Sequence, residues 1–363
     1  MMKKIGFYVA DVDPEHTSSI GIYRVTMNIL KGLIVNNINT TIFCSEDNFH
    51  QFNKFKSKNI NVCCLKKVSN SKLIDKLLWN QIIINKYAKK EKVDILFFPK
   101  GPIPIYKCKP IQYWSIIHDL IPFYYVLNKK SSISNRFKYI PMTLLLIKSA
   151  ISSDKIFTVS NYSKTKIMKF TTEKKIKVIP TGFGLAKPLD KLTLKTKNIK
   201  EKPYFYIIGN RNPHKNLERS IDLFIKYNSI HNNKYNAIIT SEKIGKYKDI
   251  NEIIFLRRVN ERELATIYKN AKLSLFLSDI EGFGLPLIES YSLNTPVVFN
   301  NKTSLKEIGN NLVGKCNIND EKSVFRAIDD VLKMNKQDIY KYKIELEKKY
   351  NWKNCVLNVI EEI

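Results

Sequence analysis

Residues 279–298, with the sequence DIEGFGLPLIESYSLNTPVV, decide the fold of this chain. The apolar run 273–277 just before them is short and bounded by polar residues, which predicts a buried strand. Residues 281–284 follow as a tight turn with two glycines, which let the backbone approach a ligand closely. Residues 285–293 then predict a helix, and 296–299 resume strand character. A strand, a turn, a helix and a second strand in this order predict a parallel α/β sheet.

Two carboxylates, Glu281 and Glu289, lie on either side of this predicted strand–helix junction. Pro286 is acceptable in the first turn of the helix, because the N–H group that proline lacks would have no helical partner there. The free N–H groups of such a helix start attract an anion, typically a phosphate. A carboxylate more than one turn into the helix can accept hydrogen bonds from sugar hydroxyls beside that phosphate. An ordinary strand–helix junction without a ligand is the alternative.

The length and composition predict a two-domain globular protein. A chain of 363 residues exceeds what a single core usually serves, and 44% hydrophobic with 26% charged residues is typical of soluble proteins. Because no uninterrupted apolar run reaches about 18 residues, no transmembrane helix is expected. The basic N-terminus soon meets Asp11 and Asp13, which predicts a first strand rather than a signal peptide. Six cysteines without paired metal spacing indicate reduced thiols in a cytoplasmic protein.

The net charge of +28 is concentrated in the first half of the chain. Residues 1–182 carry 30 Lys and Arg against 11 Asp and Glu. Such an excess favours an anionic membrane leaflet, an anionic lipid-linked acceptor or nucleic acid as a partner. We find no nucleic-acid-binding motif, which disfavours the last of these. The alternative source of part of the charge is compositional bias from an AT-rich genome, since Lys, Asn and Ile are all abundant.

Two long amphipathic stretches in the first half have two possible roles. The first, 71–90, contains the apolar residues Leu73, Ile74, Leu77, Leu78, Ile82 and Ile83. The second, 134–152, contains the run Leu-Leu-Leu-Ile at 144–147. We expect such apolar stripes to face the core while the lysines are solvated. A helix lying on a membrane surface is the alternative for both.

Several motifs together resemble one known family. Glu281 and Glu289, within Glu-Gly-Phe-Gly-Leu-Pro and followed by Thr-Pro-Val-Val, resemble the Glu-x7-Glu signature of retaining glycosyltransferases of family four (group 1), of the bacterial surface-polysaccharide type. His118-Asp-Leu follows a predicted strand and resembles the family's His-Asp-Leu motif. The segments 158–163 (Thr-Val-Ser-Asn-Tyr-Ser) and 304–307 (Ser-Leu-Lys-Glu) resemble two further family elements. The resemblance covers nearly the whole chain.

The resemblance implies an α/β protein with the GT-B fold, in which two Rossmann-like, doubly wound parallel-sheet domains face each other across a cleft. Residues 1–185 would form the acceptor-side domain, and the lysine-rich segment 186–202 the linker. Residues 203–350 would bind the nucleotide sugar. The final helix, 351–363, would cross back to the N-terminal domain.

Catalytic roles for His118, Glu281 and Lys215 are also implied by the resemblance. The histidine would lie beside the transferred sugar, Glu281 would contact that sugar, and Lys215 would neutralise the charge of the departing diphosphate. Glu289 would accept hydrogen bonds from the ribose. The position of His118 agrees with a principle independent of the family, because functional residues gather at the carboxyl ends of parallel strands.

The expected diphosphate ligands match the family pattern in part. Lys215-Asn216 matches, but Asn210 stands where the family has arginine, so Arg211 becomes a second candidate. Near the N-terminus, Gly21 matches one of the two glycines in the family's first loop. The complete set of expected donor-binding residues is Gly21, Arg211, Lys215, Val259, Gly282, Phe283, Gly284, Leu285 and Glu289.

The implied reaction is transfer of a hexose, of the mannose or rhamnose type, from a nucleotide diphosphate sugar with retention of configuration. The acceptor would be a hydroxyl of a glycan or a polyprenyl-diphosphate-linked saccharide in O-antigen or capsule synthesis, at the inner face of the cytoplasmic membrane. No cofactor or metal is expected, because Asp11-Val-Asp13 lacks further ligands. A catalytically inactive nucleotide-sugar- or polyanion-binding protein, or a sugar-nucleotide epimerase, of the same fold is the alternative.

Overall fold

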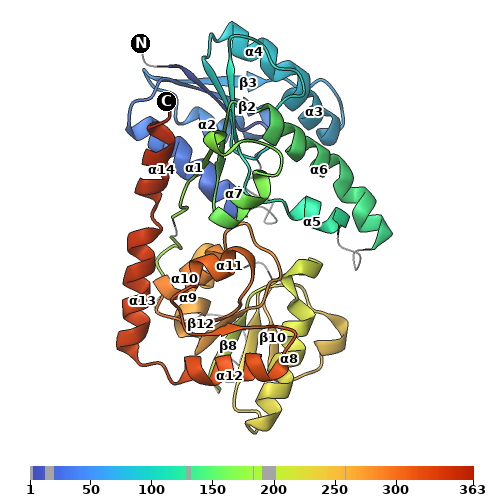
Figure 1. Cartoon of the computed structure of the whole chain (residues 1–363), viewed down its shortest axis with the longest axis vertical. Coiled ribbons are helices and arrows are strands. Elements are labelled where there is room, and N and C mark those ends of the chain that lie inside the picture. The colour runs from blue at the N-terminus through green and yellow to red at the C-terminus, as the bar shows by residue number, and fades with distance from the viewer. Residues whose placement is uncertain (1–2, 13–19, 128–131, 183, 190–201, 258) are drawn as a thin grey trace. The chain divides into compact units, whose positions relative to one another are not determined.

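The computed structural model describes residues 3–12, 20–127, 132–182, 184–189, 202–257 and 259–363. The chain forms two compact units, Met1–Gly182 with Asn351–Ile363, and Phe183–Tyr350 (Figure 1). Asp13 and most of the expected linker lie outside the described residues. Within the described residues, no helix is both long and apolar enough to cross a membrane.

The first unit is built on a seven-stranded parallel sheet with the strand order β3-β2-β1-β4-β5-β6-β7. The order reverses between β1 and β4, and ligands of open parallel sheets bind beside the strand ends at such a point. The strands are β1 Ile5–Tyr8, β2 Thr40–Ser45, β3 Ile60–Leu65, β4 Ile95–Phe98, β5 Gln112–Ile116, β6 Lys155–Thr158 and β7 Ile176–Val178. The helices are α1 Ile20–Val35, α2 Phe49–Asn53, α3 Lys72–Leu78, α4 Ile84–Lys90, α5 Ile121–Leu127, α6 Ile133–Ser152, α7 Asn161–Ile167 and α14 Trp352–Ile360.

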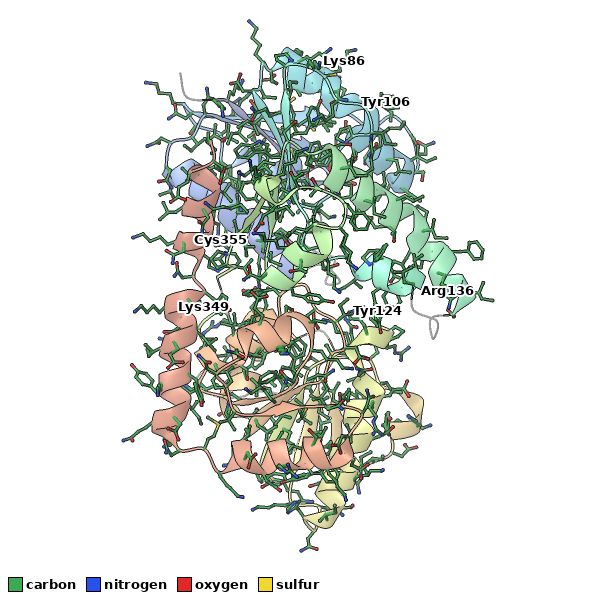
Figure 2. All side chains as sticks on the ribbon, viewed as in Figure 1. Lys86, Tyr106, Tyr124, Arg136, Lys349 and Cys355 are labelled. Atoms are coloured by element: carbon green, nitrogen blue, oxygen red, sulfur yellow. The ribbon has the colours of Figure 1, made fainter. Side chains whose placement is uncertain are left out.

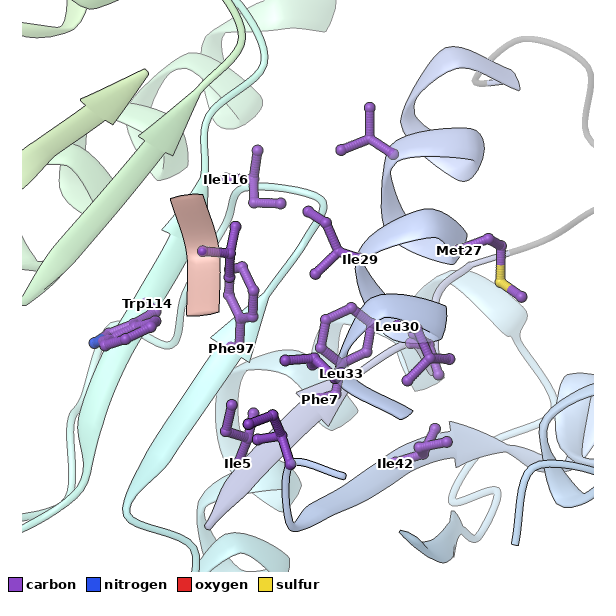
Figure 3. Close-up of a cluster of buried hydrophobic side chains, with 14 of the residues drawn as sticks. Ile5, Phe7, Met27, Ile29, Leu30, Leu33, Ile42, Phe97, Trp114 and Ile116 are labelled. Atoms are coloured by element: carbon purple, nitrogen blue, oxygen red, sulfur yellow. The ribbon is translucent and has the colours of Figure 1, made fainter. Parts of the chain in front are cut away.

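One face of this sheet is covered by α1 and α14. Alternate residues of the strands, such as Ile5, Phe7 and Phe97, form a buried cluster with the inner side of α1 (Figure 3). Gly32 lets α14 approach α1, because a Cβ at this position would lie 2.2 Å from Cγ1 of Val356. Residues from both ends of the chain, such as Ile5 and Val359, therefore belong to the same buried cluster.

The opposite face is covered by α3, α4 and α6. Here the predicted core stripe of 71–90 is wrong for most of its residues, although Ile83 packs against the core. A π-helical turn, Trp79–Ile83, joins α3 to α4 and inserts an extra residue into the helical phase. Trp79 points inward from the start of this turn, and the inserted residue lets Ile84 and Ala88 point inward after it. The predicted core residues Leu73, Ile74, Leu77 and Ile82 are instead exposed.

The second unit holds a six-stranded parallel sheet with the strand order β10-β9-β8-β11-β12-β13. Its strands are β8 Tyr204–Ile207, β9 Asn236–Ile239, β10 Ile253–Phe255, β11 Leu273–Phe276, β12 Val297–Asn300 and β13 Lys315–Cys316. Its helices are α8 Leu217–Ile230, α9 Glu261–Asn270, α10 Leu285–Ser292, α11 Thr303–Ile308, α12 Glu321–Leu332 and α13 Lys336–Lys349. Two parallel α/β sheets confirm the predicted fold class.

Candidate functional site

The centre of the candidate site is an ion pair between Lys215 and Glu281. The two residues follow β8 and β11, which are neighbours in the sheet, so both loops leave the same carboxyl edge. Nζ of Lys215 lies 2.6 Å from Oε1 of Glu281, and the side chains are only 20% and 10% exposed. The ammonium also lies over the Phe276 ring, 5.7 Å from its centroid. Because desolvation offsets much of the attraction in such a pair, stability alone does not explain its presence.

The backbone of the Glu281 turn is held against the start of α11. The Ser304 hydroxyl donates a hydrogen bond to the Glu281 carbonyl over 2.9 Å, and the Glu281 N–H donates to Oγ1 of Thr303 over 3.4 Å. At Gly284 the backbone has φ +119°, and a Cβ there would lie 2.6 Å from Cδ2 of Leu305. Gly284 is therefore required for two reasons: other residues are strained at this φ, and there is no room for a Cβ atom.

The helix α10 begins directly after Gly284 and carries the second carboxylate. Pro286 lies in its first turn, as predicted, and Glu289 is buried one turn further on. The carboxylate of Glu289 contributes, after burial, to a raised pKa of the Tyr206 hydroxyl at the end of β8. That hydroxyl shares a hydrogen bond of 2.8 Å with Oγ1 of Thr240, which follows β9. Tyr206 and Thr240 thus join Glu289 in the site, although the sequence analysis did not select them.

His214 is a further member that the sequence analysis missed. Its side chain is buried, and this burial lowers its pKa to about 4, with a smaller contribution from the positive charge of Lys215. Its carbonyl accepts a hydrogen bond of 2.8 Å from the Asp279 N–H, which ties the two site loops together. The position immediately before the Lys215-Asn216 motif was the signal that could have identified it.

Arg211 and Val259 lie at the margin of this arrangement. Nη2 of Arg211 donates a hydrogen bond of 3.0 Å to the Lys243 carbonyl, and the residue lines a cavity of about 640 Å³. Among the interactions of the described residues, none joins Arg211 to Lys215 or Glu281. Val259 is half-buried in the loop directly before α9. Residues lining the cavity also include Asn210, Asn212, Pro213, Asn216, Leu217, Glu218, Arg219, Ile244 and Gly245.

His118 lies in the first unit, beyond the end of β5. Its Nε2–H donates a hydrogen bond of 2.8 Å to the Pro99 carbonyl at the end of β4, which leaves Nδ1 as the unprotonated nitrogen. The residue is half-buried, and desolvation of its ring lowers the pKa to about 4. The Ser163 hydroxyl donates to the His118 carbonyl over 3.2 Å, so two of the predicted motifs are in direct contact.

Comparison with known proteins identifies the family. The profile of Glycosyltransferase Family 4 matches residues 20–187, and that of Glycosyl transferases group 1 matches residues 190–346. Together they cover most of the chain. This chain belongs to the family-four, group 1 glycosyltransferases.

A curated relative of this glycosyltransferase chain is the O-antigen chain mannosyltransferase RfbU of Salmonella typhimurium, 29% identical over 229 residues. The match covers 59% of each protein, so the chain spans about three-fifths of that relative's length.

Solved structures show the GT-B fold. Sucrose-phosphate synthase of Thermosynechococcus elongatus has a TM-score of 0.71 at 13% identity, covering 99% of this chain and 98% of that one. The HepE protein of Anabaena, solved in complex with UDP and glucose, has a TM-score of 0.68 at 13% identity. That match covers 100% of this chain and 99% of the other.

One of the expected site features differs in the structure. Gly21 lies in the first turn of α1 and is therefore a helix residue, whereas we expected a loop. Asp11, half of the Asp-x-Asp pattern, forms an ion pair of 3.4 Å with Lys100. The described residues contain no group of three His, Cys, Asp or Glu side chains that could hold a metal ion.

Proposed function

We propose that this chain is a retaining glycosyltransferase that uses a nucleotide diphosphate sugar as its donor. The observation that carries the proposal is the largely buried Lys215–Glu281 pair at the turn that leads into α10. Amide N–H groups and a nearby ammonium are the elements that bind and neutralise a diphosphate. The family membership of the chain supports the same reaction class.

In the proposed mechanism, the bond between the anomeric carbon and the diphosphate oxygen breaks, and a bond to the acceptor oxygen forms on the same face. The acceptor proton passes to the departing phosphate. Lys215 neutralises the developing negative charge on the diphosphate. Glu281 holds the Lys215 ammonium in the free protein and contacts the donor sugar when the diphosphate draws that ammonium away. Glu289 accepts hydrogen bonds from the ribose hydroxyls, and no metal takes part.

We further propose that the donor carries a mannose-type sugar and that the acceptor is a lipid-linked saccharide of O-antigen or capsule synthesis. The name of the relative RfbU, an O-antigen chain mannosyltransferase, supports both choices. The basic first half of the chain fits an acceptor that bears a diphosphate and lies at the cytoplasmic face of a membrane.

A panel of GDP-, UDP-, ADP- and dTDP-linked sugars, measured by thermal shift and by product formation, tests the proposal. A ligand that binds only the folded state raises the melting temperature. We expect a shift for one nucleotide class that persists in EDTA, followed by transfer of the sugar with retained configuration. Binding without transfer to any lipid-linked saccharide would favour an inactive nucleotide-sugar-binding protein. A shift that requires a divalent cation would contradict the metal-independent mechanism.

A further inference from the structure

The first unit exposes apolar side chains on elements whose inner faces are already packed. On α3 and the π-helical turn, the exposed residues include Leu73, Leu77 and Ile82. On α6, Phe137, Leu144 and Ile151 are 69%, 60% and 53% exposed and follow one another at intervals of seven residues. This interval returns to nearly the same side of a helix after two turns. Each helix therefore presents an apolar stripe to its surroundings.

The loop 101–107 connects the two stripes into one surface. Asn85 donates a hydrogen bond of 2.8 Å to the Tyr106 carbonyl, and Gln81 accepts one of 3.0 Å from the Ile105 N–H. On the other side of the loop, the Ser149 hydroxyl of α6 accepts from the Ile103 N–H over 2.9 Å. Figure 1 shows α3 and α6 on the same side of the sheet, and Figure 2 shows Tyr106 next to Lys86 at the edge of the unit. We name the outward side of 72–83, 105–106 and 133–151 the lysine-rimmed face.

The segments that form this face carry an excess of positive charge. Within 72–90, 101–110 and 133–152, Asp75 is the only acidic residue in the sequence. Its side chain is buried, and Oδ1 accepts a hydrogen bond of 3.0 Å from the Val68 N–H. The same segments carry exposed lysines, among them Lys72, Lys86 and Lys148. Two of the lysines pair with carboxylates outside these segments, Lys72 with Asp47 at 3.5 Å and Lys107 with Asp154 at 2.8 Å. Exposed lysines such as Lys86 and Lys148 still leave an excess of positive charge beside the apolar side chains.

We propose that the lysine-rimmed face binds the surface of an anionic lipid bilayer. Apolar side chains that enter the interface, surrounded by lysines that contact anionic headgroups, are the two features that hold a peripheral helix on a membrane. A second copy of this chain fits the face poorly, because two identical lysine-rich surfaces would repel each other. The inference deepens the proposed function by assigning the surface through which the chain reaches a lipid-linked acceptor.

Vesicle flotation of the full chain tests this assignment without any need for turnover. We expect the protein to float with phosphatidylcholine vesicles that contain phosphatidylglycerol, and to stay at the bottom with phosphatidylcholine alone. The double variant Leu77→Ser/Leu144→Ser should lose flotation. Lys86→Ala and Lys148→Ala should each weaken the partition constant about fivefold at low salt, the effect of one basic residue near an anionic surface.

Matched variants in the second unit are the controls. Ile230→Ser removes an equally exposed apolar residue, and Lys226→Ala removes an exposed lysine, so both should float like the unmodified chain. Flotation that is unchanged in the Leu77→Ser/Leu144→Ser variant would overturn the proposal. The proposal would also be overturned if the unmodified chain formed a dimer, detected by light scattering, that the Leu77→Ser/Leu144→Ser variant did not form. Donor binding is measured separately by thermal shift. A protein that binds its donor but does not float would therefore overturn the membrane proposal and leave the proposed glycosyltransferase function intact.

Discussion

At the scale of single residues, Lys215 shows how a chemical role depends on its partner. The sequence selects it as a lysine next to an asparagine before a helix. The structure adds Glu281, 66 positions later, in contact with its ammonium within a largely buried setting. A charge with a single partner in such a setting responds strongly to the loss of that partner.

Lys215→Ala should lower kcat by about 10²-fold or more, because the charge that stabilises the leaving diphosphate is lost. It should also reduce the free energy of unfolding by about 3 kcal/mol, because Glu281 keeps a buried charge without a partner. Urea denaturation and initial-rate kinetics measure the two effects.

Two comparisons separate these effects. Lys215→Met/Glu281→Gln removes both charges and should recover much of the stability but none of the activity. Lys226→Ala breaks an exposed pair with Glu321, also 2.6 Å long, and should change both quantities little. Recovery of activity in the double variant would exclude Lys215 from catalysis.

The buried His214 predicts a pH dependence of stability. Its folded pKa of about 4 lies below the value near 6.5 in the unfolded chain. Between these values the unfolded state binds a proton that the folded state does not, so stability falls as the pH drops from about 6.5 to about 4. His214→Gln should remove up to about 1.4 kcal/mol per pH unit from this slope. Urea titrations of both proteins at several pH values measure the slope.

At the scale of elements, the turn 281–284 is defined by its contacts with α11 as much as by its own glycines. The Ser304 hydroxyl and the Leu305 side chain fix where the turn can run. The short helix α11 therefore helps to hold the turn in place. In 72–90 the burial of Trp79 sets which side of α3 faces the core, and the π-helical turn then brings Ile84 and Ala88 to the same side.

Gly284→Ala should destabilise the second unit by about 1–3 kcal/mol, because alanine is strained at φ +119° and its Cβ would meet Leu305. The thermal shift produced by the donor nucleotide sugar should also diminish, since the start of α10 would move. Gly184→Ala is the matched control, because a Cβ there has nothing within 4 Å. A Gly284→Ala variant with normal stability and donor binding would show that the turn tolerates rearrangement.

At the scale of the whole molecule, the first unit is assembled from both ends of the chain. Residues 351–363 belong to it, although 168 residues of the second unit, Phe183–Tyr350, intervene. The contact depends on Gly32 of α1 facing Val356 of α14. The core of this unit therefore includes residues that are distant in the sequence.

A double-mutant cycle measures that contact. Gly32→Ala should cost about 1–3 kcal/mol, because its Cβ would overlap the Val356 side chain. In the Val356→Ala background the same substitution should cost less, since the overlapping Cγ atoms are gone and alanine favours the helix. Thermal denaturation of the four proteins gives the coupling energy. Equal costs in both backgrounds would mean that α14 does not pack on α1 in solution.

The sequence by itself determined the fold class and predicted the residues of the candidate site. Both rest on local patterns: apolar runs of strand length between helical segments, and a turn with two glycines between two carboxylates. Lys215 and Glu281 were predicted separately, from motifs that each span a few residues.

Only the tertiary structure decided which residues meet. The pairing of β8 with β11 brings Lys215 to Glu281, and β9 brings Thr240 to Tyr206. The burial of the His214 side chain and the exposure of the outer face of α3 could not be predicted, because burial depends on packing partners distant in sequence. At 71–90 the deciding partner was the large Trp79 side chain, whose burial sets the helix phase against the local apolar pattern.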